Sequence, residues 1–263
     1  MWKSVTSRAG VWGAWLAVSA LWLTGLAGAA SLSDTIDRIR PGVVAVGTVL
    51  PTRRPPANFL GSGFVVGDGR HVLTNAHVLP DSLDERRKEY LAVFAGRGRQ
   101  VEARPAVQVA QDLEHDLVLL KIDGNPLPPL AVGDSRQVRE GKELAFTGFP
   151  IGVVLGLFPV THRGMVSAIT PIAIPVPSSR QLDPALIRRL RAPYDVFQLD
   201  ATAYPGNSGS PLYEPDSGRV VGVINMVFVK ESKERVLQEP SGIAYAIPIA
   251  YARPLLQQAG GGR

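Results

Sequence analysis

Ser208 is the residue of this chain whose setting most favours covalent chemistry. It lies in the segment YPGNSGSPL, residues 204–212, where two glycines and two prolines predict a tight turn. A serine between glycines usually only helps to form a turn, and its hydroxyl is a poor nucleophile at neutral pH. It becomes reactive when a base lies within hydrogen-bond reach. A catalytic interpretation of Ser208 therefore requires a histidine and a carboxylate elsewhere in the chain.

Of the four histidines in the chain, His77 is the best candidate for that base. It follows an apolar run in the segment VLTNAHVL, at the end of a predicted strand. Catalytic groups are often carried by connections that a rigid scaffold positions, rather than by its core. His71 begins a predicted strand and His162 lies within one, so we interpret both as structural or exposed. His115 directly precedes an aspartate, Asp116.

Asp116 is the carboxylate that best fits as a partner for the histidine. It opens the very apolar strand LVLLKI, and a carboxylate in that position is partly desolvated and needs a hydrogen-bonded partner. Asp112 lies in looser, polar surroundings. No second histidine lies near His115 at helical ligand spacing, so we expect no metal site. The segment GSGFVVGDG lacks the spacing of a dinucleotide loop, and we expect no cofactor.

Composition excludes several other classes of protein. The chain contains no cysteine, which excludes thiol catalysis and cysteine-ligated zinc, and its stability must come from packing rather than disulfides. The net charge of +5 over 263 residues is small and scattered, so we expect no nucleic-acid partner. The 27 glycines and 22 prolines indicate many short elements rather than long helices.

Residues 1–29 have the layout of a secretory signal peptide. Lys3 and Arg8 precede the apolar run VWGAWLAVSALWLTGLAGAA, and Ala27-Gly28-Ala29 offers small residues for cleavage. The apolar run is close to the length of a membrane span, so an uncleaved anchor that tethers the chain to a membrane is the alternative. We therefore expect the protein in a bacterial periplasm or outside the cell.

The rest of the chain is predicted to form short strands in two sets. A short helix, capped by Ser33 and ended by Pro41-Gly42, is expected before the first set. A Pro/Gly-rich connector at 124–141 separates the sets, which predicts two β domains, 30–130 and 131–263. The predicted strands are 43–49, 63–66, 71–74, 91–94, 101–110, 117–122, 143–147, 160–169, 196–200, 220–229 and 242–247.

One segment, QLDPALIRRLRAPY, departs from the strand pattern. It predicts a helix over 183–192, with Asp183 as its cap and Pro184 at its first position. Leucines share one side of this helix, and arginines spread over the remainder. We interpret it as a surface helix docked by its leucines, and a basic site for a partner is the alternative.

Three motifs, in the order histidine, aspartate, serine, resemble those of chymotrypsin-like serine proteases. They are TNAHVL with His77, HDLVLLKI with Asp116 and GNSGSPL with Ser208. The resemblance is greatest to the bacterial high-temperature-requirement (HtrA/Deg) branch and covers residues 33 to 256. Further matching fragments are GSGFVV at 61–66, GMVSAI at 164–169 and GIAYAIP at 242–248. The resemblance implies an all-β fold of two antiparallel β-barrels, with the active site between them and short helices at both ends.

The resemblance also implies a role for each motif residue. Ser208 would attack the scissile carbonyl, and His77 would take its proton and pass it to the leaving amine. Asp116 would fix the tautomer of the imidazole and stabilise its charged form. The backbone N–H groups of Gly206 and Ser208 would form the oxyanion hole.

The specificity pocket implied by the resemblance has Thr202 and Ala203 at its base. Its wall includes the strand residues Ile224, Asn225 and Met226. A pocket for Lys or Arg would carry an aspartate six residues before the serine, and this chain has Thr202 there. Glutamate-specific relatives usually carry a histidine at the position of Ile224. We therefore expect an apolar pocket that accepts small to medium aliphatic residues.

Together, these patterns predict an exported serine endopeptidase that hydrolyses unfolded or extended polypeptides through a His-Asp-Ser triad and an acyl-enzyme intermediate. The alternative is a catalytically silent or partner-activated binding protein that keeps the protease fold. Many HtrA proteins carry a C-terminal PDZ domain, and we expect none here because the chain stops at LLQQAGGGR. The sequence leaves the natural substrate and a homo-oligomeric state open.

Overall fold

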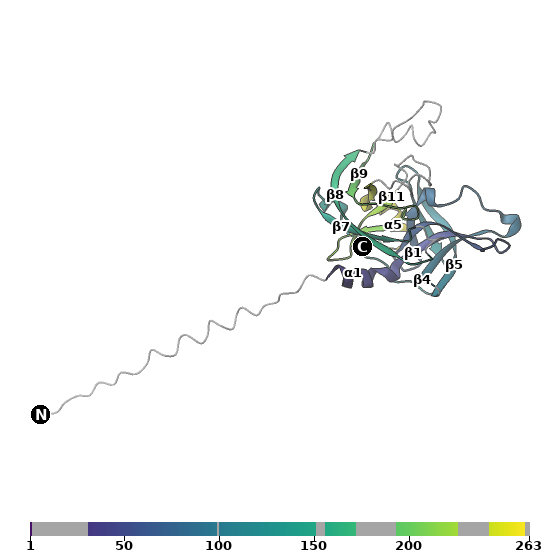
Figure 1. The fold of residues 1–263 in the computed structure, drawn as a ribbon, viewed down its shortest axis with the longest axis horizontal. Helices are drawn as coiled ribbons and strands as arrows, with labels where there is room; N and C mark the ends of the chain where they lie inside the picture. Colours follow the sequence, from purple (N-terminus) through teal and green to yellow (C-terminus); the bar gives the residue numbers. More distant parts are fainter. Residues whose placement is uncertain (2–30, 99, 151–155, 172–192, 226–241, 261–263) are drawn as a thin grey trace.

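Two closed, six-stranded antiparallel β-barrels make up most of the chain, with a short helix at each end (Figure 1). The computed structural model describes residue 1 and residues 31–98, 100–150, 156–171, 193–225 and 242–260. This architecture confirms the predicted fold class. The predicted signal segment and the predicted helix at 183–192 lie outside the described residues. Within the described ranges, no helix is long and apolar enough to cross a membrane.

The first barrel closes in the strand order β1-β2-β3-β6-β5-β4. Alternating residues of its strands, such as Val44 and Val46 of β1, fill the barrel interior with Val65 and Val72. The intervening residues of β1, Val43 and Ala45, are also buried, but against the second barrel. The strands are β1 (Val43–Val49), β2 (Ala57–Val66), β3 (His71–Asn75), β4 (Tyr90–Arg97), β5 (Gln100–Asp112) and β6 (Leu117–Ile122).

The second barrel closes in the order β10-β11-β12-β9-β8-β7. Leu144, Phe146 and Ile224 lie in its interior, while Tyr213 and Val223 belong to a core cluster shared with Phe64 and other residues of the first barrel. The shared cluster packs the two barrels against each other. The strands are β7 (Glu143–Gly148), β8 (Val160–Pro171), β9 (Asp195–Asp200), β10 (Pro211–Tyr213), β11 (Val220–Asn225) and β12 (Ile243–Pro248).

Each terminal helix contacts the barrel to which it is not directly joined in the sequence. Helix α1 (Leu32–Ile39) precedes the first barrel, yet Arg38 donates a hydrogen bond to the carbonyl of Ser217 in the second. Helix α5 (Arg253–Gln258) follows the second barrel and contacts β5 and β6 of the first. The 3₁₀ helices are η1 (Arg40–Gly42), η2 (Ala76–Val78), η3 (Glu85–Arg87), η4 (Ser135–Gln137) and η6 (Ile249–Ala252).

The structure differs from the sequence prediction in several elements, among them α1, β2 and β10. Helix α1 is capped by Ser31 rather than Ser33, because Ser31 and Asp34 cap each other's backbone N–H groups reciprocally. Strand β2 begins at Ala57, six residues earlier than predicted. The prediction missed its first half because that part contains Asn58 and glycine and shows no regular alternation of apolar and polar residues. Strand β10 was not predicted, because it has only three residues and directly follows the turn around Ser208.

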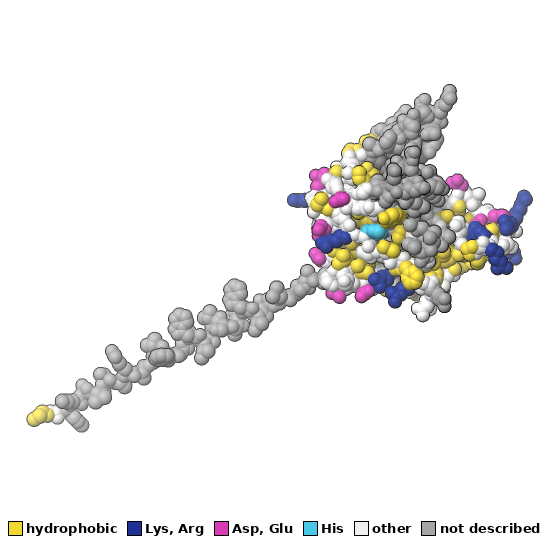
Figure 2. Space-filling model, viewed as in Figure 1, with side chains coloured by type: hydrophobic (Ala, Val, Ile, Leu, Met, Phe, Trp, Pro, Cys, Tyr) yellow, Lys and Arg dark blue, Asp and Glu magenta, His cyan; other side chains and the backbone are white. Residues whose placement is uncertain are grey.

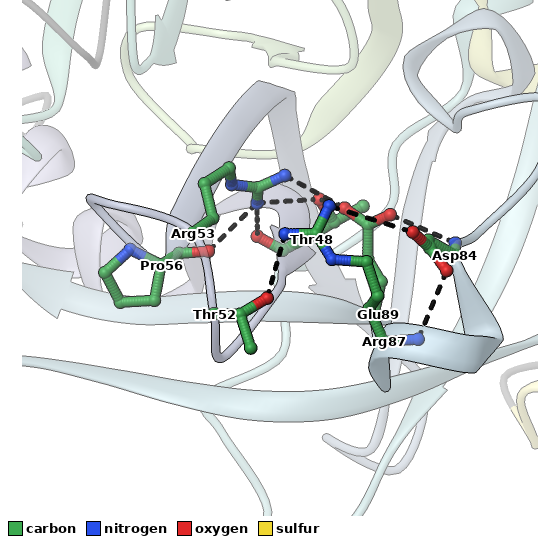
Figure 3. Close-up of polar contacts among 7 residues, drawn as sticks. All are labelled: Thr48, Thr52, Arg53, Pro56, Asp84, Arg87 and Glu89. Carbon is green, nitrogen blue, oxygen red and sulfur yellow. Dashed lines mark hydrogen bonds and ion pairs between the residues drawn. The ribbon is translucent and has the colours of Figure 1, made fainter.

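A polar network ties together two connections at one end of the first barrel (Figure 3). The Arg53 guanidinium donates to the Glu89 carboxylate at 3.0 Å and to the carbonyl of Pro56 at 2.9 Å. The Thr48 hydroxyl and the Asp84 N–H also donate to Glu89, at 2.8 and 3.1 Å. These hydrogen bonds, led by that from Thr48, hold the pKa of Glu89 below its usual value of 4.5.

Outside this network, charge is mixed on the surface: basic and acidic side chains are interspersed across the face in view in Figure 2. Charges of both signs therefore offset each other locally on that face. This pattern is typical of a solvated surface and differs from a single-sign binding face.

We predict that Glu89→Gln lowers the free energy of unfolding at pH 7 and that the loss disappears in acid. Because the folded-state pKa of Glu89 is depressed, its stabilisation is present above pH 4.5 and is lost as the pH falls through the folded-state value. Urea denaturation of both proteins across this range measures the difference. Glu85→Gln, on the same connection, is the control. A pH-independent difference would contradict the assignment.

Candidate active site

Asp116 and His77 come together because β3 and β6 are antiparallel neighbours. Asn75, the last residue of β3, pairs with Leu117, the first residue of β6. The 3₁₀ turn that follows β3 therefore places His77 beside the residue that precedes β6. The backbone of Asp116 is left-handed, with φ 54°. Its carbonyl accepts hydrogen bonds from the Ala76 N–H and the Asn75 side-chain amide, both at 3.1 Å, and these bonds secure that conformation.

The Asp116 carboxylate holds both the backbone and the ring of His77. Oδ1 accepts from the His77 backbone N–H at 2.9 Å, and Oδ2 lies 2.6 Å from His77 Nδ1. The Asp116 side chain is only 7% exposed, while that of His77 is 32% exposed. An imidazole that donates from Nδ1 to a carboxylate keeps Nε2 free to accept a proton. The pair therefore presents an oriented base at the edge of the first barrel.

The second barrel contributes a third group to this pair. The Asn225 side-chain amide, at the end of β11, donates to Asp116 Oδ2 at 2.7 Å. Asn225 is fully buried. The sequence predicted Asn225 as part of the specificity pocket, which stays a prediction, and the structure adds its contact with the Asp116 carboxylate. A carboxylate buried between the barrels is thus satisfied by donors from both.

Ser208 lies on a tight turn that precedes β10. The turn is closed by hydrogen bonds from the Asn207 N–H to the Tyr204 carbonyl, at 2.9 Å, and from the Ser210 N–H to the Asn207 carbonyl, at 3.0 Å. Gly206 and Gly209 have φ 98° and 85°, in the region that favours glycine. At Gly209 a Cβ atom would lie 2.0 Å from the Ser62 carbonyl oxygen. The glycines that flank the serine are therefore required by the turn.

The turn is held against the first barrel at the junction that also contains His77 and Asp116. The Ser62 N–H of β2 donates to the Ser208 carbonyl at 2.8 Å. Within the described part of the chain, the Ser208 hydroxyl makes no hydrogen bond with the His77 ring. Serine–histidine contacts are often loose in the absence of substrate. Ser208 and Asn225 come from the second barrel, so neither barrel carries the complete arrangement.

The backbone N–H groups of Gly206 and Ser208 donate to no other group among the described residues. Two such groups, two residues apart on a turn beside a serine, can both donate to an oxygen that gains negative charge. The turn therefore supplies unpaired donors close to the serine.

A trypsin-like peptidase domain is the family whose model matches the chain, over residues 61–223. The chain belongs to the trypsin-like peptidase family. Residues 61–223 run from the glycine that precedes Ser62 in β2 to the centre of β11. The match thus includes His77, Asp116 and the turn of Ser208.

Known serine proteases of this kind are similar to most of the chain. A probable periplasmic serine endoprotease, DegP-like, from Halomonas elongata is 31% identical over 199 residues, which are 76% of this chain and 35% of that protein. Human serine protease HTRA4 is 29% identical over 231 residues, 86% of this chain and 41% of its own length. The chain thus spans between about a third and two fifths of these relatives.

Solved structures of HtrA proteases share the fold. The HtrA-type protease AlgW with a tripeptide has a TM-score of 0.63 and 27% identity, covering 88% of this chain and 64% of its own. A serine endoprotease from Yersinia pestis has a TM-score of 0.60 and 25% identity, covering 89% of this chain and 68% of its own. These likenesses agree with the HtrA branch that the sequence motifs resemble.

Of the remaining residues of the predicted pocket, those that the structure describes lie in or near the core of the second barrel. Ala203 and Ile224 are buried in the same apolar cluster as Ala244, and Thr202 is half-buried. Met226 lies outside the described residues. The pocket therefore stays a prediction, supported by the apolar character of this cluster.

The other histidines of the peptidase domain have structural contacts. His115 Nδ1 lies 2.7 Å from Asp112 Oδ2, and its ring stacks on Tyr251 with centroids 4.3 Å apart. His162 stacks on Phe146, and burial lowers the pKa of His162 below its usual 6.5. The His115–Asp112 pair thus has the same chemistry as His77–Asp116, away from the Ser208 turn.

We predict that Gly209→Ala destabilises this turn more than an equivalent change elsewhere. At Gly141 φ is 84° and no atom lies within 4 Å of the place that a Cβ atom would take, so Gly141→Ala costs only the left-handed backbone penalty, about 1–2 kcal/mol. Gly209→Ala adds contacts at 2.0 Å with the Ser62 carbonyl and 2.3 Å with the Thr74 hydroxyl. Urea denaturation should show a larger loss at Gly209. Equal losses of unfolding free energy would mean that the turn accommodates the added methyl group by shifting, with no further loss of stability.

Proposed function

We propose that the chain is an exported serine endopeptidase that hydrolyses peptide bonds of unfolded or extended polypeptides. One observation carries this proposal: a buried carboxylate orients His77 at the junction of the barrels, beside a turn that presents Ser208 and two free N–H groups. This arrangement matches the requirements of acyl transfer, namely a nucleophile, a positioned base and donors for an oxyanion.

In the proposed reaction, His77 Nε2 takes the proton of the Ser208 hydroxyl as its oxygen attacks the scissile carbonyl carbon. The carbonyl oxygen becomes negative and accepts hydrogen bonds from the Gly206 and Ser208 N–H groups. Loss of one such donor typically costs about 10²–10³-fold in kcat. The Asp116 carboxylate stabilises the imidazolium that forms.

The tetrahedral intermediate then collapses with cleavage of the C–N bond. His77 gives its proton to the leaving amine, and an acyl ester of Ser208 remains. Water, deprotonated by the same imidazole, attacks the ester carbonyl through a second tetrahedral intermediate. The ester bond breaks, Ser208 regains its proton, and the carboxylic acid product leaves.

Several observations support export and a polypeptide substrate. Relatives at about 30% identity are named periplasmic serine endoproteases, and residues 1–29 have the layout of a signal peptide. HtrA-type structures with a tripeptide and with a decapeptide are among the structural neighbours. The apolar surroundings of Ala203 and Ile224 favour small to medium aliphatic residues before the cleaved bond.

We predict that a fluorophosphonate probe labels Ser208 of the mature chain at neutral pH. The label requires an activated serine, so His77→Ala and Ser208→Ala should both abolish it. Mass spectrometry of the digested adduct locates the label. Labelling that requires an added peptide would favour the partner-activated alternative. A chain that binds unfolded polypeptide without ever being labelled would overturn the enzymatic proposal in favour of a binding protein.

The His77–Asp116 and His115–Asp112 pairs, in which the carboxylate contacts both the ring and the backbone N–H of the histidine, provide a matched test of the base. We predict that Asp116→Asn lowers kcat on denatured casein about 10⁴-fold, the loss typical when this aspartate is replaced by its amide in serine proteases. Asp112→Asn makes the same chemical change beside His115 and should retain most activity. Similar losses in both variants would contradict the assignment. Cleavage sites in the casein digest also test the pocket, and cuts mainly after Lys, Arg or Glu would exclude an aliphatic preference.

A further inference from the structure

Ser62 is a fully buried serine of β2 that sits between the glycines of the segment GSG. Its hydroxyl donates to the Gly206 carbonyl at 2.6 Å and accepts from the Phe149 N–H, just after β7, at 2.9 Å. We propose that Ser62 is a positioning residue that sets the orientation of the two oxyanion-hole N–H groups. The catalytic consequence rests on the proposed function, while the structural role does not.

Two backbone contacts add to those of the hydroxyl. The Ser62 N–H donates to the Ser208 carbonyl at 2.8 Å, and the Ser62 carbonyl accepts from the Thr74 hydroxyl at 2.6 Å. Ser62 therefore binds the carbonyls of both residues whose N–H groups are free. It also joins three parts of the fold: β2, the end of β7 and the turn before β10.

These contacts fix the peptide units on either side of the Ser208 N–H. The 206–207 peptide is held through its carbonyl by the Ser62 hydroxyl and through the Asn207 N–H by the Tyr204 carbonyl. The 208–209 peptide is held through its carbonyl by the Ser62 N–H and through the Gly209 N–H by the Ile224 carbonyl. The peptide that carries the Ser208 N–H lies between these two fixed units.

At Gly206 the hydrogen bond from the Ser62 hydroxyl restricts the orientation of the peptide more than the residue type itself does. Glycine has broad backbone freedom, so its residue type alone does not select one direction for the peptide planes beside it. A carbonyl that is partly removed from water is more stable when it accepts a hydrogen bond. The bond from Ser62 thus selects the orientation that satisfies the Gly206 carbonyl and leaves the Gly206 N–H free.

The polar side chains of the turn itself do not supply this restraint. The Asn207 side-chain amide and the Ser210 hydroxyl are fully buried and have no hydrogen-bond partner among the described residues. The Ser62 hydroxyl, in the same pocket, has both a donor and an acceptor partner. The orientation of this turn therefore depends on a side chain from the other barrel.

Glycines around Ser62 allow the turn to pack closely against it. A Cβ atom at Gly61 would lie 3.0 Å from the Ser208 carbonyl oxygen, and one at Gly148 would lie 2.8 Å from the Ser62 hydroxyl oxygen. Glycines at these positions permit the approach of β2 and of the end of β7 to the turn. The hydroxyl then completes the contact.

Ser62→Ala, with Thr48→Val as the control, tests the proposal. Both changes remove a buried hydroxyl of the first barrel, but among the described residues the Thr48 hydroxyl bonds to Arg53 and Glu89 and not to the turn. We expect Ser62→Ala to lower kcat about 10²-fold with little change in KM, the loss that follows a small misplacement of catalytic groups. Thr48→Val should leave kcat unchanged. Equal losses in the two variants, or a change confined to KM, would overturn the catalytic role.

A second readout does not depend on activity. The ¹H–¹⁵N resonances of Gly206 and Ser208 should shift or broaden in Ser62→Ala, and their amide hydrogens should exchange faster, while Thr48→Val leaves both unchanged. Unchanged resonances and exchange would overturn the positioning role, whether or not the chain is an enzyme. Altered resonances in Ser62→Ala, together with a wild-type protein that cleaves nothing, would keep the positioning role and reject the proposed function.

If Ser62→Ala fails to fold, Ser62→Cys provides the same test. Its thiol has a similar shape and is a weak donor. The resonances of Gly206 and Ser208 should then move in the folded protein, and kcat should fall without a change in KM. A wild-type kcat and wild-type resonances in this variant would contradict the proposal.

Discussion

The buried Asp116 carboxylate is the group on which the arrangement of the site depends. A carboxylate that is removed from water is strongly unfavourable unless hydrogen bonds replace its solvation. Here the donors are the backbone and ring of His77 and the side-chain amide of Asn225. The hydrogen bonds from His77 that stabilise the buried charge therefore also orient the imidazole. The fold must bring all of these donors to the carboxylate.

Because these donors come from different barrels, the contact between the barrels is part of the site. His77 and Asp116 lie at the ends of β3 and β6, whereas Asn225 ends β11 and Ser208 precedes β10. A shared apolar core and the terminal helices hold the barrels together. A change in the relative position of the barrels would separate His77 from Ser208 and would also remove a hydrogen-bond donor from the buried Asp116 carboxylate.

Backbone conformations that residues other than glycine rarely adopt occur at this junction. Asp116 has a left-handed backbone, and the turn of Ser208 contains two residues with positive φ. Such conformations survive where surrounding contacts determine them, and they occur often at functional sites. At Asp116 the contacts come from Asn75 and Ala76, and at the turn they come from Ser62. The glycines permit the backbone angles of the turn, and the hydrogen bonds from Ser62 of β2 determine its orientation.

The sequence by itself predicted the candidate site residues and determined the class of fold. The order of the His77, Asp116 and Ser208 motifs, the two sets of short strands and the glycines around Ser208 are local patterns, each visible within a few residues. It also predicted the two barrels, which the structure confirms. It missed the strand β10 and the start of β2, because β10 has only three residues and the start of β2 lacks a regular alternation of apolar and polar residues.

Only the tertiary structure decided which side chains of distant segments meet. The bond from Asn225 to Asp116 spans 109 residues and that from Ser62 to Gly206 spans 144, and no local pattern links either pair. The structure likewise separated two chemically equivalent pairs, placing His77–Asp116 at the junction with Ser208 and His115–Asp112 beside Tyr251. Residue type and spacing define what a group can do, whereas strand pairing and barrel packing determine which partner it reaches.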